Sequence, residues 1–229
     1  MNTIISYHEL VGIEKQSLQR GMNYRCSKDH SVFLMSTRSN APYDDEIAAD
    51  GRILIYEGHD SDKRYSKNPK KDDQPRSFPS GKMTENGKFE KAALDFKHNK
   101  RKAEIVRVYE KIKDGIWSFN GIFRLVDSYK KKVNGRIVFK FILHLTDEKI
   151  KGLEEGAELE SDNRMIPSDV KVKVWKRDKG QCAKPKCHSK EHLHFDHIIP
   201  YIKGGTSKDP KNIQLLCARH NAEKSDRII

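Results

Sequence analysis

Hydrophobic residues in the first 146 positions gather in short runs that are rich in β-branched and aromatic side chains. Such runs are typical of strands, and we expect strands at residues 31–36, 52–56, 104–109, 116–126 and 136–145. One segment instead has apolar residues at i, i+3, i+4 and i+7, namely Phe89, Ala92, Ala93 and Phe96. This period predicts an amphipathic helix. Residues 63–80 are polar and contain three prolines, which predicts a long loop.

A change in composition separates the C-terminal part of the chain from the rest. Residues 151–163 are acidic and nearly free of large apolar side chains, as is typical of a linker. From Val170 onward the chain is basic and rich in cysteine and histidine. The sequence therefore predicts a β-rich domain over residues 1–150, a linker over 151–169 and a small domain over 170–229.

The hydrophobic pattern of the small domain predicts a strand, a loop and a helix. Apolar and polar positions alternate from Leu193 to His197, as on a strand. Pro200 and the Gly204-Gly205 pair then predict a loop. Asn212 opens an apolar run that leads into a polar segment, which we expect to be helical.

The charge of the chain favours a polyanionic partner. The net charge is +12, and residues 164–229 contribute +8 of it, from 15 Lys and Arg against 7 Asp and Glu. Basic segments neutralise nucleic-acid phosphates and release counterions, although a generic basic surface would carry the same charge. No run approaches the roughly 20 apolar residues of a membrane span, and the first residues do not form a secretory signal.

Three of the four cysteines lie near the C-terminus, in two pairs of potential ligands. Cys182 and Cys187 form a CxxxxC pair, and Cys217 and His220 form a CxxH pair about thirty residues later. Thiolates and an imidazole in two such pairs can complete one tetrahedral zinc site, which stabilises a domain that has a small apolar core. His188 is a competing ligand, and free buried cysteines are the alternative.

The segments DHIIP, GG, N and LCARHNAEK follow one another in an order that resembles the HNH nuclease family, a ββα-metal fold with a zinc-stapled variant. The resemblance covers about residues 170–229. It implies that His197 is the general base that activates water, and that Asp196 binds the catalytic divalent cation. It also implies that Asn212 orients the base and that Asn221 is the other metal ligand. Asparagine at this last position departs from the histidine that ends the named motif.

These residue types suit phosphodiester hydrolysis, which needs an activated water and a cation that stabilises negative charge. The unperturbed pKa of histidine, near 6.5, suits a general base. Mg²⁺ or Mn²⁺ prefers the oxygen ligands of Asp196 and Asn221, whereas zinc prefers the Cys and His pairs. Lys224 stands where the family often keeps a lysine, and it either contacts phosphate or lies on a solvated helix face.

The first 150 residues resemble a second family. Segments at 40–60, 73–93 and 106–127 follow the order of the SRA domain, the SET- and RING-associated module that flips a modified cytosine out of DNA. The match spans most of residues 10–146. The residues that carry it are Tyr43-Asp44-Asp45-Glu46, Gly51, Tyr56-Glu57-Gly58, Asp73-Gln74 and Phe139-Lys140-Phe141.

This second resemblance implies a pocket that holds the flipped base by stacking and by hydrogen bonds to its edge. Tyr43 and Tyr56 would stack on the base, and Asp45 or Glu46 would accept from the cytosine amino group. One extra residue before Gly51 leaves the choice between the two acids open. Ordinary packing in the core is the alternative for both tyrosines.

Together these features predict a modification-dependent restriction endonuclease of the α+β class. An SRA-like barrel or curved sheet with flanking helices would recognise 5-methylcytosine or a relative in double-stranded DNA, and the HNH domain would cut. The expected cofactors are one structural Zn²⁺ and a catalytic Mg²⁺ or Mn²⁺. Double-strand cleavage by single sites implies a homodimer or two binding events, and the expected location is the cytoplasm of a bacterial or archaeal cell. The alternatives are an HNH endonuclease with another targeting rule, such as a mobile-element nuclease, and a non-catalytic zinc-stabilised reader.

Overall fold

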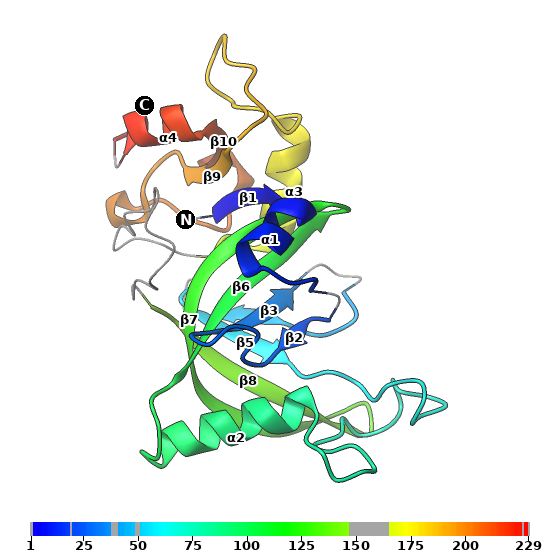
Figure 1. Ribbon diagram of the computed structural model, residues 1–229. Helices are drawn as coiled ribbons and strands as arrows, with labels where there is room; N and C mark the ends of the chain where they lie inside the picture. Colours follow the sequence, from blue (N-terminus) through cyan, green and yellow to red (C-terminus); the bar gives the residue numbers. More distant parts are fainter. Residues whose placement is uncertain are drawn as a thin grey trace.

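The computed structural model describes residues 2–18, 20–37, 41–48, 51–146, 165–225 and 227–228. Ten strands within these ranges join into one sheet (Figure 1). They are β1 (Asn2–Ser6), β2 (Met22–Asn23), β3 (Ser31–Met35), β4 (Glu46–Ala48), β5 (Ile53–Glu57), β6 (Glu104–Lys113), β7 (Ile116–Val133), β8 (Arg136–Thr146), β9 (Leu193–His197) and β10 (Ile213–Cys217). The helices are α1 (Tyr7–Glu14), α2 (Glu85–Lys97), α3 (Ser168–Arg177) and α4 (Ala218–Lys224), with 3-10 turns η2 (Tyr201–Lys203) and η3 (Pro210–Asn212).

Three long antiparallel strands, β6, β7 and β8, form the middle of the sheet. β7 changes partners along its length, since its first part pairs with β1 and β6 and its second part with β8. A register shift between Leu125 and Asp127 marks a bulge, which bends a strand and increases its twist. The sheet is therefore curved (Figure 1). The predicted α+β class with a curved sheet is confirmed.

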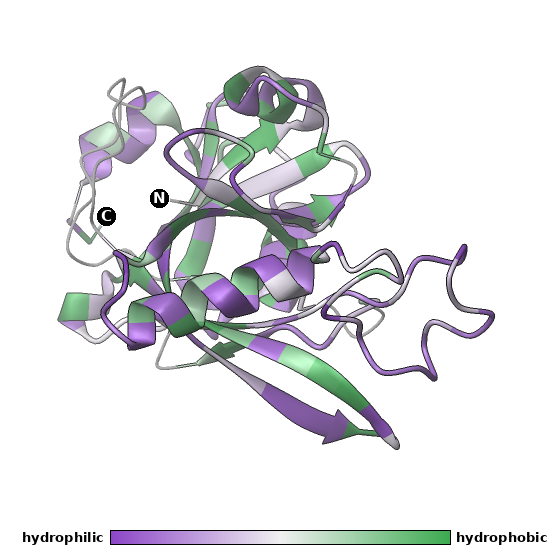
Figure 2. Cartoon of the chain, turned by 60° about the horizontal axis from the view of Figure 1, so that its bottom comes forward, coloured by the Kyte–Doolittle hydropathy of each residue, from purple (hydrophilic) through white to green (hydrophobic). Residues whose placement is uncertain are grey.

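Helix α2 lies across the curved sheet (Figure 2). Thr84 caps its first turn by accepting a hydrogen bond from the Gly87 amide. The face predicted to be apolar is buried at Phe89, Ala92 and Ala93. The Phe89 ring packs edge-on against Phe33 of β3, with centroids 4.6 Å apart. The predicted helix is confirmed, as are the five predicted strands, although β6 and β7 extend beyond their predicted ends at residues 109 and 126, to Lys113 and Val133.

The C-terminal hairpin β9–β10 continues the large sheet. β1, the first strand of the chain, pairs with β7 along one edge and with β9 along the other. Apolar residues of β1, β6 and β7 pack in the same core cluster as those of α3, β9 and β10: Ile4, Ile112, Ile116, Ile166, Val170, Val174, Leu193, Phe195, Ile213, Leu215 and Leu216. The two parts of the chain therefore share one sheet and one cluster of core residues.

The end of the expected linker is packed against both parts. Residues 151–164 lie outside the described residues, whereas Met165 is buried in the core of the large sheet and Ile166 in the shared cluster. α3 begins at Ser168 and buries Lys171, whose ammonium lies 2.7 Å from the Glu110 carboxylate of β6. In the part of the chain that the structure describes, no helix is long and apolar enough to cross a membrane.

Candidate functional site

Four side chains from both sides of the β9–β10 hairpin meet in one cluster. Cys182 and Cys187 precede the hairpin, Cys217 ends β10, and His220 lies in the first turn of α4. Their ligand atoms all lie within 4.8 Å of one another. His220 Nδ1 is 3.3 Å from Cys182 Sγ and 3.4 Å from Cys217 Sγ. Tetrahedral zinc with Zn–S bonds of about 2.3 Å separates its ligand atoms by about 3.5–3.8 Å, so the predicted ligands fit a structural zinc, and His188 is not part of this cluster.

The loop between β9 and β10 is held closed by Asn212. The Asn212 side chain accepts from the Ile199 amide at 2.9 Å and donates to the carbonyls of Ile199 and Thr206, both at 3.0 Å. A Cβ at Gly205 would lie 1.8 Å from the Ile199 carbonyl oxygen, so only glycine lets the loop approach this closely. The geometry suits the positioning role implied by the resemblance, because the fixed segment directly follows His197.

Strand β9 carries Asp196 and His197 to the start of this loop. The Asp196 carboxylate accepts from Gln214 Nε2 at 3.0 Å, across the β9–β10 pair in which these two residues are partners. His197 Nε2 lies 2.9 Å from Ser207 Oγ. Sequence reasoning missed Gln214 and Ser207, because their roles depend on strand register and on the closure of the loop.

Helix α4 presents a buried lysine to Asp196. Lys224 is 1% exposed, and its ammonium lies 3.3 and 3.4 Å from the two Asp196 carboxylate oxygens. A solvated helix face, one of the two alternatives for this residue, is therefore wrong. Asn221 lies three residues before Lys224, on the same side of the helix, and this side faces β9. The structure thus places Asp196 and Asn221 on adjacent elements.

A second candidate site is a cleft of about 400 Å³ beside the first turn of α2. Tyr43 and His59 line it, and their rings are nearly parallel, with centroids 4.5 Å apart and an interplanar angle of 8°. The Lys70 ammonium lies 4.1 Å from the Tyr43 ring centroid. The lining also includes basic and acidic side chains: Arg20, Lys82, Lys88, Asp60, Asp62 and Glu85. The cleft therefore combines an aromatic pair with charged groups.

Of the four residues predicted to hold a flipped base, Tyr43 alone lines this cleft. Tyr56 is 1% exposed and stacks on Phe33 in the core, with centroids 4.1 Å apart. The buried Asp45 carboxylate accepts from the backbone amides of Ser36 and Glu57 at 3.1 and 3.0 Å. Burial raises the pKa of Asp45 to about 7. Glu46 begins β4 and is exposed.

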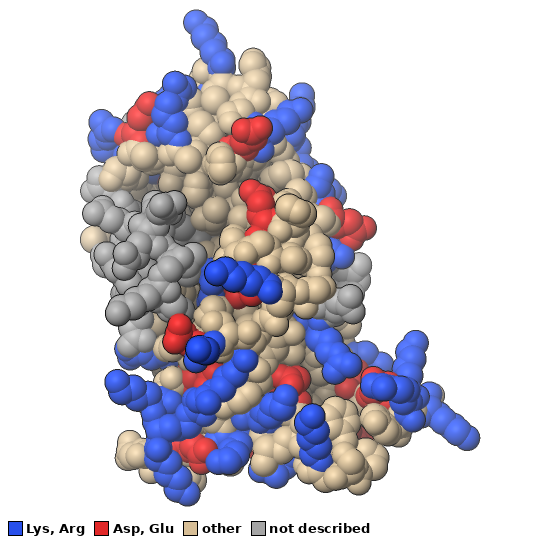
Figure 3. All heavy atoms as spheres, in the orientation of Figure 1, with Lys and Arg blue, Asp and Glu red and all other residues tan. Residues whose placement is uncertain are grey.

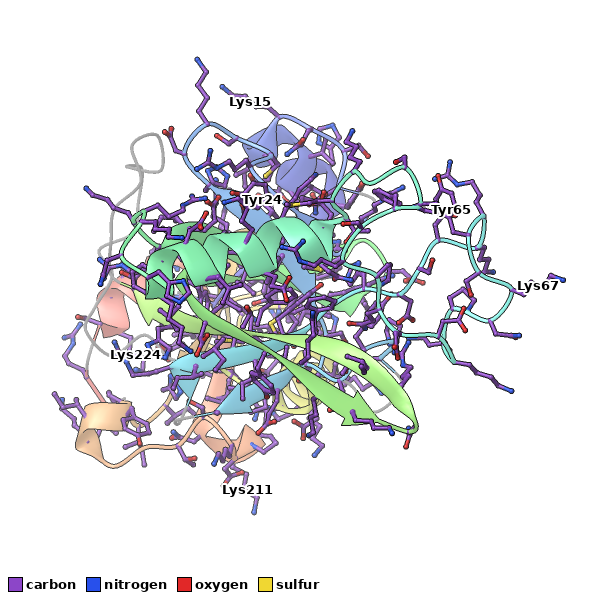
Figure 4. The ribbon with its side chains drawn as sticks, turned by 90° about the horizontal axis from the view of Figure 1, so that it is seen from below. Lys15, Tyr24, Tyr65, Lys67, Lys211 and Lys224 are labelled. Atoms are coloured by element: carbon purple, nitrogen blue, oxygen red, sulfur yellow. The ribbon has the colours of Figure 1, made fainter. Side chains whose placement is uncertain are left out.

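Basic side chains gather at the end of the molecule that carries α2 and the β7–β8 hairpin (Figure 3). The exposed lysines of these elements include Lys91, Lys97, Lys130, Lys131 and Lys132. The loop between β5 and α2 stands away from the sheet and carries Tyr65 and Lys67 (Figure 4). This end of the molecule offers a surface to an anionic partner.

Comparison with known families gives a match for the C-terminal part. Residues 180–227 match the model of the HNH endonuclease family. This range contains the Cys and His cluster, Asp196, His197, Asn212 and Asn221. The C-terminal part therefore carries an HNH endonuclease domain. No curated protein is similar enough in sequence to be counted as a match.

Several solved structures are similar to the chain. The SUVH5 SRA domain with fully methylated CG DNA is 22% identical and has a TM-score of 0.41, covering 62% of this chain and 83% of that one. KRYPTONITE in complex with mCHG DNA and SAH is 17% identical, with a TM-score of 0.40 and coverage of 71% and 37%. The Type IV phosphorothioation-dependent restriction endonuclease ScoMcrA is 16% identical, with a TM-score of 0.34 and coverage of 86% and 50%.

Proposed function

We propose that this protein is a modification-dependent DNA endonuclease, which recognises a modified cytosine in double-stranded DNA and hydrolyses the backbone at its HNH domain. The observation that carries the nuclease part is the arrangement of Asp196, His197 and Asn212 on a hairpin beside the Cys and His cluster, inside the segment that matches the HNH family.

In this proposal, His197 accepts a proton from the attacking water, and Ser207 fixes the orientation of its imidazole at 2.9 Å. Asp196 and Asn221 would hold a Mg²⁺ or Mn²⁺ ion, which would supply positive charge for the phosphate and the leaving oxygen. Gln214 orients the Asp196 carboxylate, and Lys224 forms an ion pair with it. Asn212 holds the segment after His197 in place.

The large sheet supplies the recognition of DNA in this proposal. Its support is the aromatic pair in a cleft, the basic surface at the same end of the molecule, and the ordered SRA-like segments of the sequence. Asp45 lies two residues after Tyr43 and anchors the segment that carries this tyrosine, because its carboxylate accepts from the backbone amides of Ser36 and Glu57. A single HNH site cuts one strand, so double-strand cleavage requires a second copy or a second binding event.

The test is digestion of matched DNA that is unmodified, methylated, hydroxymethylated or glucosylated at cytosine, with Mg²⁺ or Mn²⁺. We expect cleavage of modified DNA alone, and its loss in His197→Ala and Asp196→Ala. DNA binding by His197→Ala should persist, because this change removes no phosphate-binding charge. Cleavage by His197→Ala at the wild-type rate would refute the nuclease site. Equal cleavage of all four DNAs would instead refute the recognition of a modification and favour another targeting rule.

A further inference from the structure

The aromatic ring that faces Tyr43 in the cleft belongs to His59. Phe33 covers Tyr56 at a centroid distance of 4.1 Å, and the Tyr56 side chain is 1% exposed. His59 lies on the cleft side of Tyr56, with its ring centroid 6.0 Å from that of Tyr56 and 4.5 Å from that of Tyr43. A base in the cleft therefore meets Tyr43 and His59, whereas Tyr56 is screened from it.

Three residues fix His59 in place. Asn86, the second residue of α2, accepts from the His59 amide and donates to the His59 carbonyl, both at 2.8 Å. The Tyr56 hydroxyl donates to the Leu34 carbonyl and lies 3.0 Å from His59 Nε2. A Cβ at Gly21 would lie 2.6 Å from the imidazole, so the chain at Gly21 packs directly against its edge.

Tyr43 is held less firmly than His59. Its hydroxyl accepts from the Asp60 amide at 3.4 Å, a long hydrogen bond. The Lys70 ammonium lies over its ring, and the same ammonium forms an ion pair with Asp60 at 2.8 Å. The rings of Tyr43 and His59 are parallel, as are the two rings that stack on opposite faces of a base. A displacement of Tyr43 alone would open the space between them.

We propose that a flipped base enters between Tyr43 and His59, so that His59 rather than Tyr56 is the second stacking residue of the pocket. This inference rests on the proposed function, since it specifies how the modified base is held. Burial lowers the pKa of His59 to about 4, so the imidazole is neutral at pH 7 and stacks as an uncharged ring. Tyr56 then acts as a positioning residue, because its hydroxyl contacts the imidazole from the core side.

The experiment measures affinity for matched methylated and unmodified duplexes in the full chain that carries His197→Ala, which prevents cleavage. In this background, His59→Ala and His59→Gln should lose affinity for the methylated duplex by about 5- to 150-fold, the usual range for one stacked base. Binding of the unmodified duplex, which depends on phosphate contacts, should stay unchanged. His59→Phe keeps a ring and should retain most of the preference. Tyr7→Ala removes an aromatic ring on α1, away from α2 (Figure 1), and is the matched control that should leave the preference unchanged.

Circular dichroism and thermal melting of each variant separate a loss of stacking from a loss of fold. Wild-type or tighter binding of methylated DNA by a folded His59→Ala variant would overturn the inference, because the ring would then block the pocket instead of forming it. In that case the proposed function stands. If the parent His197→Ala chain binds both duplexes equally, the proposed recognition of a modified cytosine is wrong, whatever the role of His59.

Discussion

Replacing Lys171 by methionine should loosen the attachment of α3 to the large sheet. The Lys171 and Glu110 side chains are both 0% exposed and form an ion pair at 2.7 Å. The Lys171 ammonium also donates to Asn120 Oδ1 at 2.6 Å and to Ser118 Oγ at 3.2 Å. Methionine preserves the length of the side chain but not its charge. The Glu110 carboxylate would then be buried with neutral donors alone, from Asn120 and Ser168.

Removing one partner of a buried ion pair typically costs about 3–5 kcal/mol, because the other charge remains uncompensated. We expect this loss in the free energy of unfolding of Lys171→Met. The double variant Lys171→Met/Glu110→Gln carries neither charge and should recover more than half of it. Burial lowers the pKa of Lys171, whereas the neighbouring Glu110 carboxylate acts to raise it. Lys171→Met is expected to destabilise the protein regardless of this shift.

The assay is urea unfolding followed by tryptophan fluorescence, since Trp175 lies on α3 and Trp117 on β7. Lys173→Met is the matched control, because Lys173 is 63% exposed and pairs with Asp169, itself 62% exposed, at 3.3 Å. Exposed pairs contribute at most about 1 kcal/mol. If Lys171→Met and Lys173→Met unfold at the same urea concentration, the buried pair does not secure α3 and the reasoning is refuted.

Three further predictions concern the zinc cluster, the loop clamp and pH. Metal analysis should find about one zinc per chain, and Cys217→Ser should lower the melting temperature; full stability of a zinc-free sample would contradict the site. Asn212→Asp places a carboxylate against the Ile199 and Thr206 carbonyls, so cleavage should fall at least about tenfold at unchanged DNA affinity. Burial lowers the pKa of His59 and of His194 from 6.5 to about 4. At these two histidines the folded state then binds fewer protons than the unfolded state, so each should lower stability between pH 6.5 and 4, by at most about 3 kcal/mol. The raised pKa of Asp45 acts in the opposite sense and offsets part of this loss, so a net fall remains. Equal urea midpoints at pH 7.5 and pH 5 would contradict this last prediction.

Local hydrophobic patterns predicted those helices and strands in which the buried residues recur with the period of the element itself. The apolar stripe of α2 and the runs that became β3 and β5–β8 are examples, because one face or both faces of each are buried in the core. α3 escaped prediction because the segment VKVKV alternates like a strand, with β-branched residues that favour one. Packing decides in favour of the helix, since Val170 and Val174 lie one turn apart and are both buried.

The candidate sites likewise contain residues that local patterns could predict and residues that they could not. The cluster of Cys182, Cys187, Cys217 and His220 could be predicted, because two short spacings bring each pair together whatever the fold between them. Tyr56 illustrates the opposite case, since a motif match does not reveal which face of a strand is covered. The alternation of Leu54 and Tyr56 in β5 was the available signal, because both side chains are buried on one face. His59, Gln214 and Ser207 depend on contacts between distant segments, which no local pattern contains.

The position of β1 between β7 and β9 changes what a break in the backbone would do. A protease that cut the chain anywhere between residues 147 and 164 would leave two fragments that are still joined by the β1–β9 pairing, the Lys171–Glu110 ion pair and the shared apolar cluster. Such a nicked protein should elute from a sizing column as one species. A different nuclease domain grafted onto the large sheet would need its own strand to pair with β1, because a covalent connection at the acidic segment alone would leave an unpaired edge.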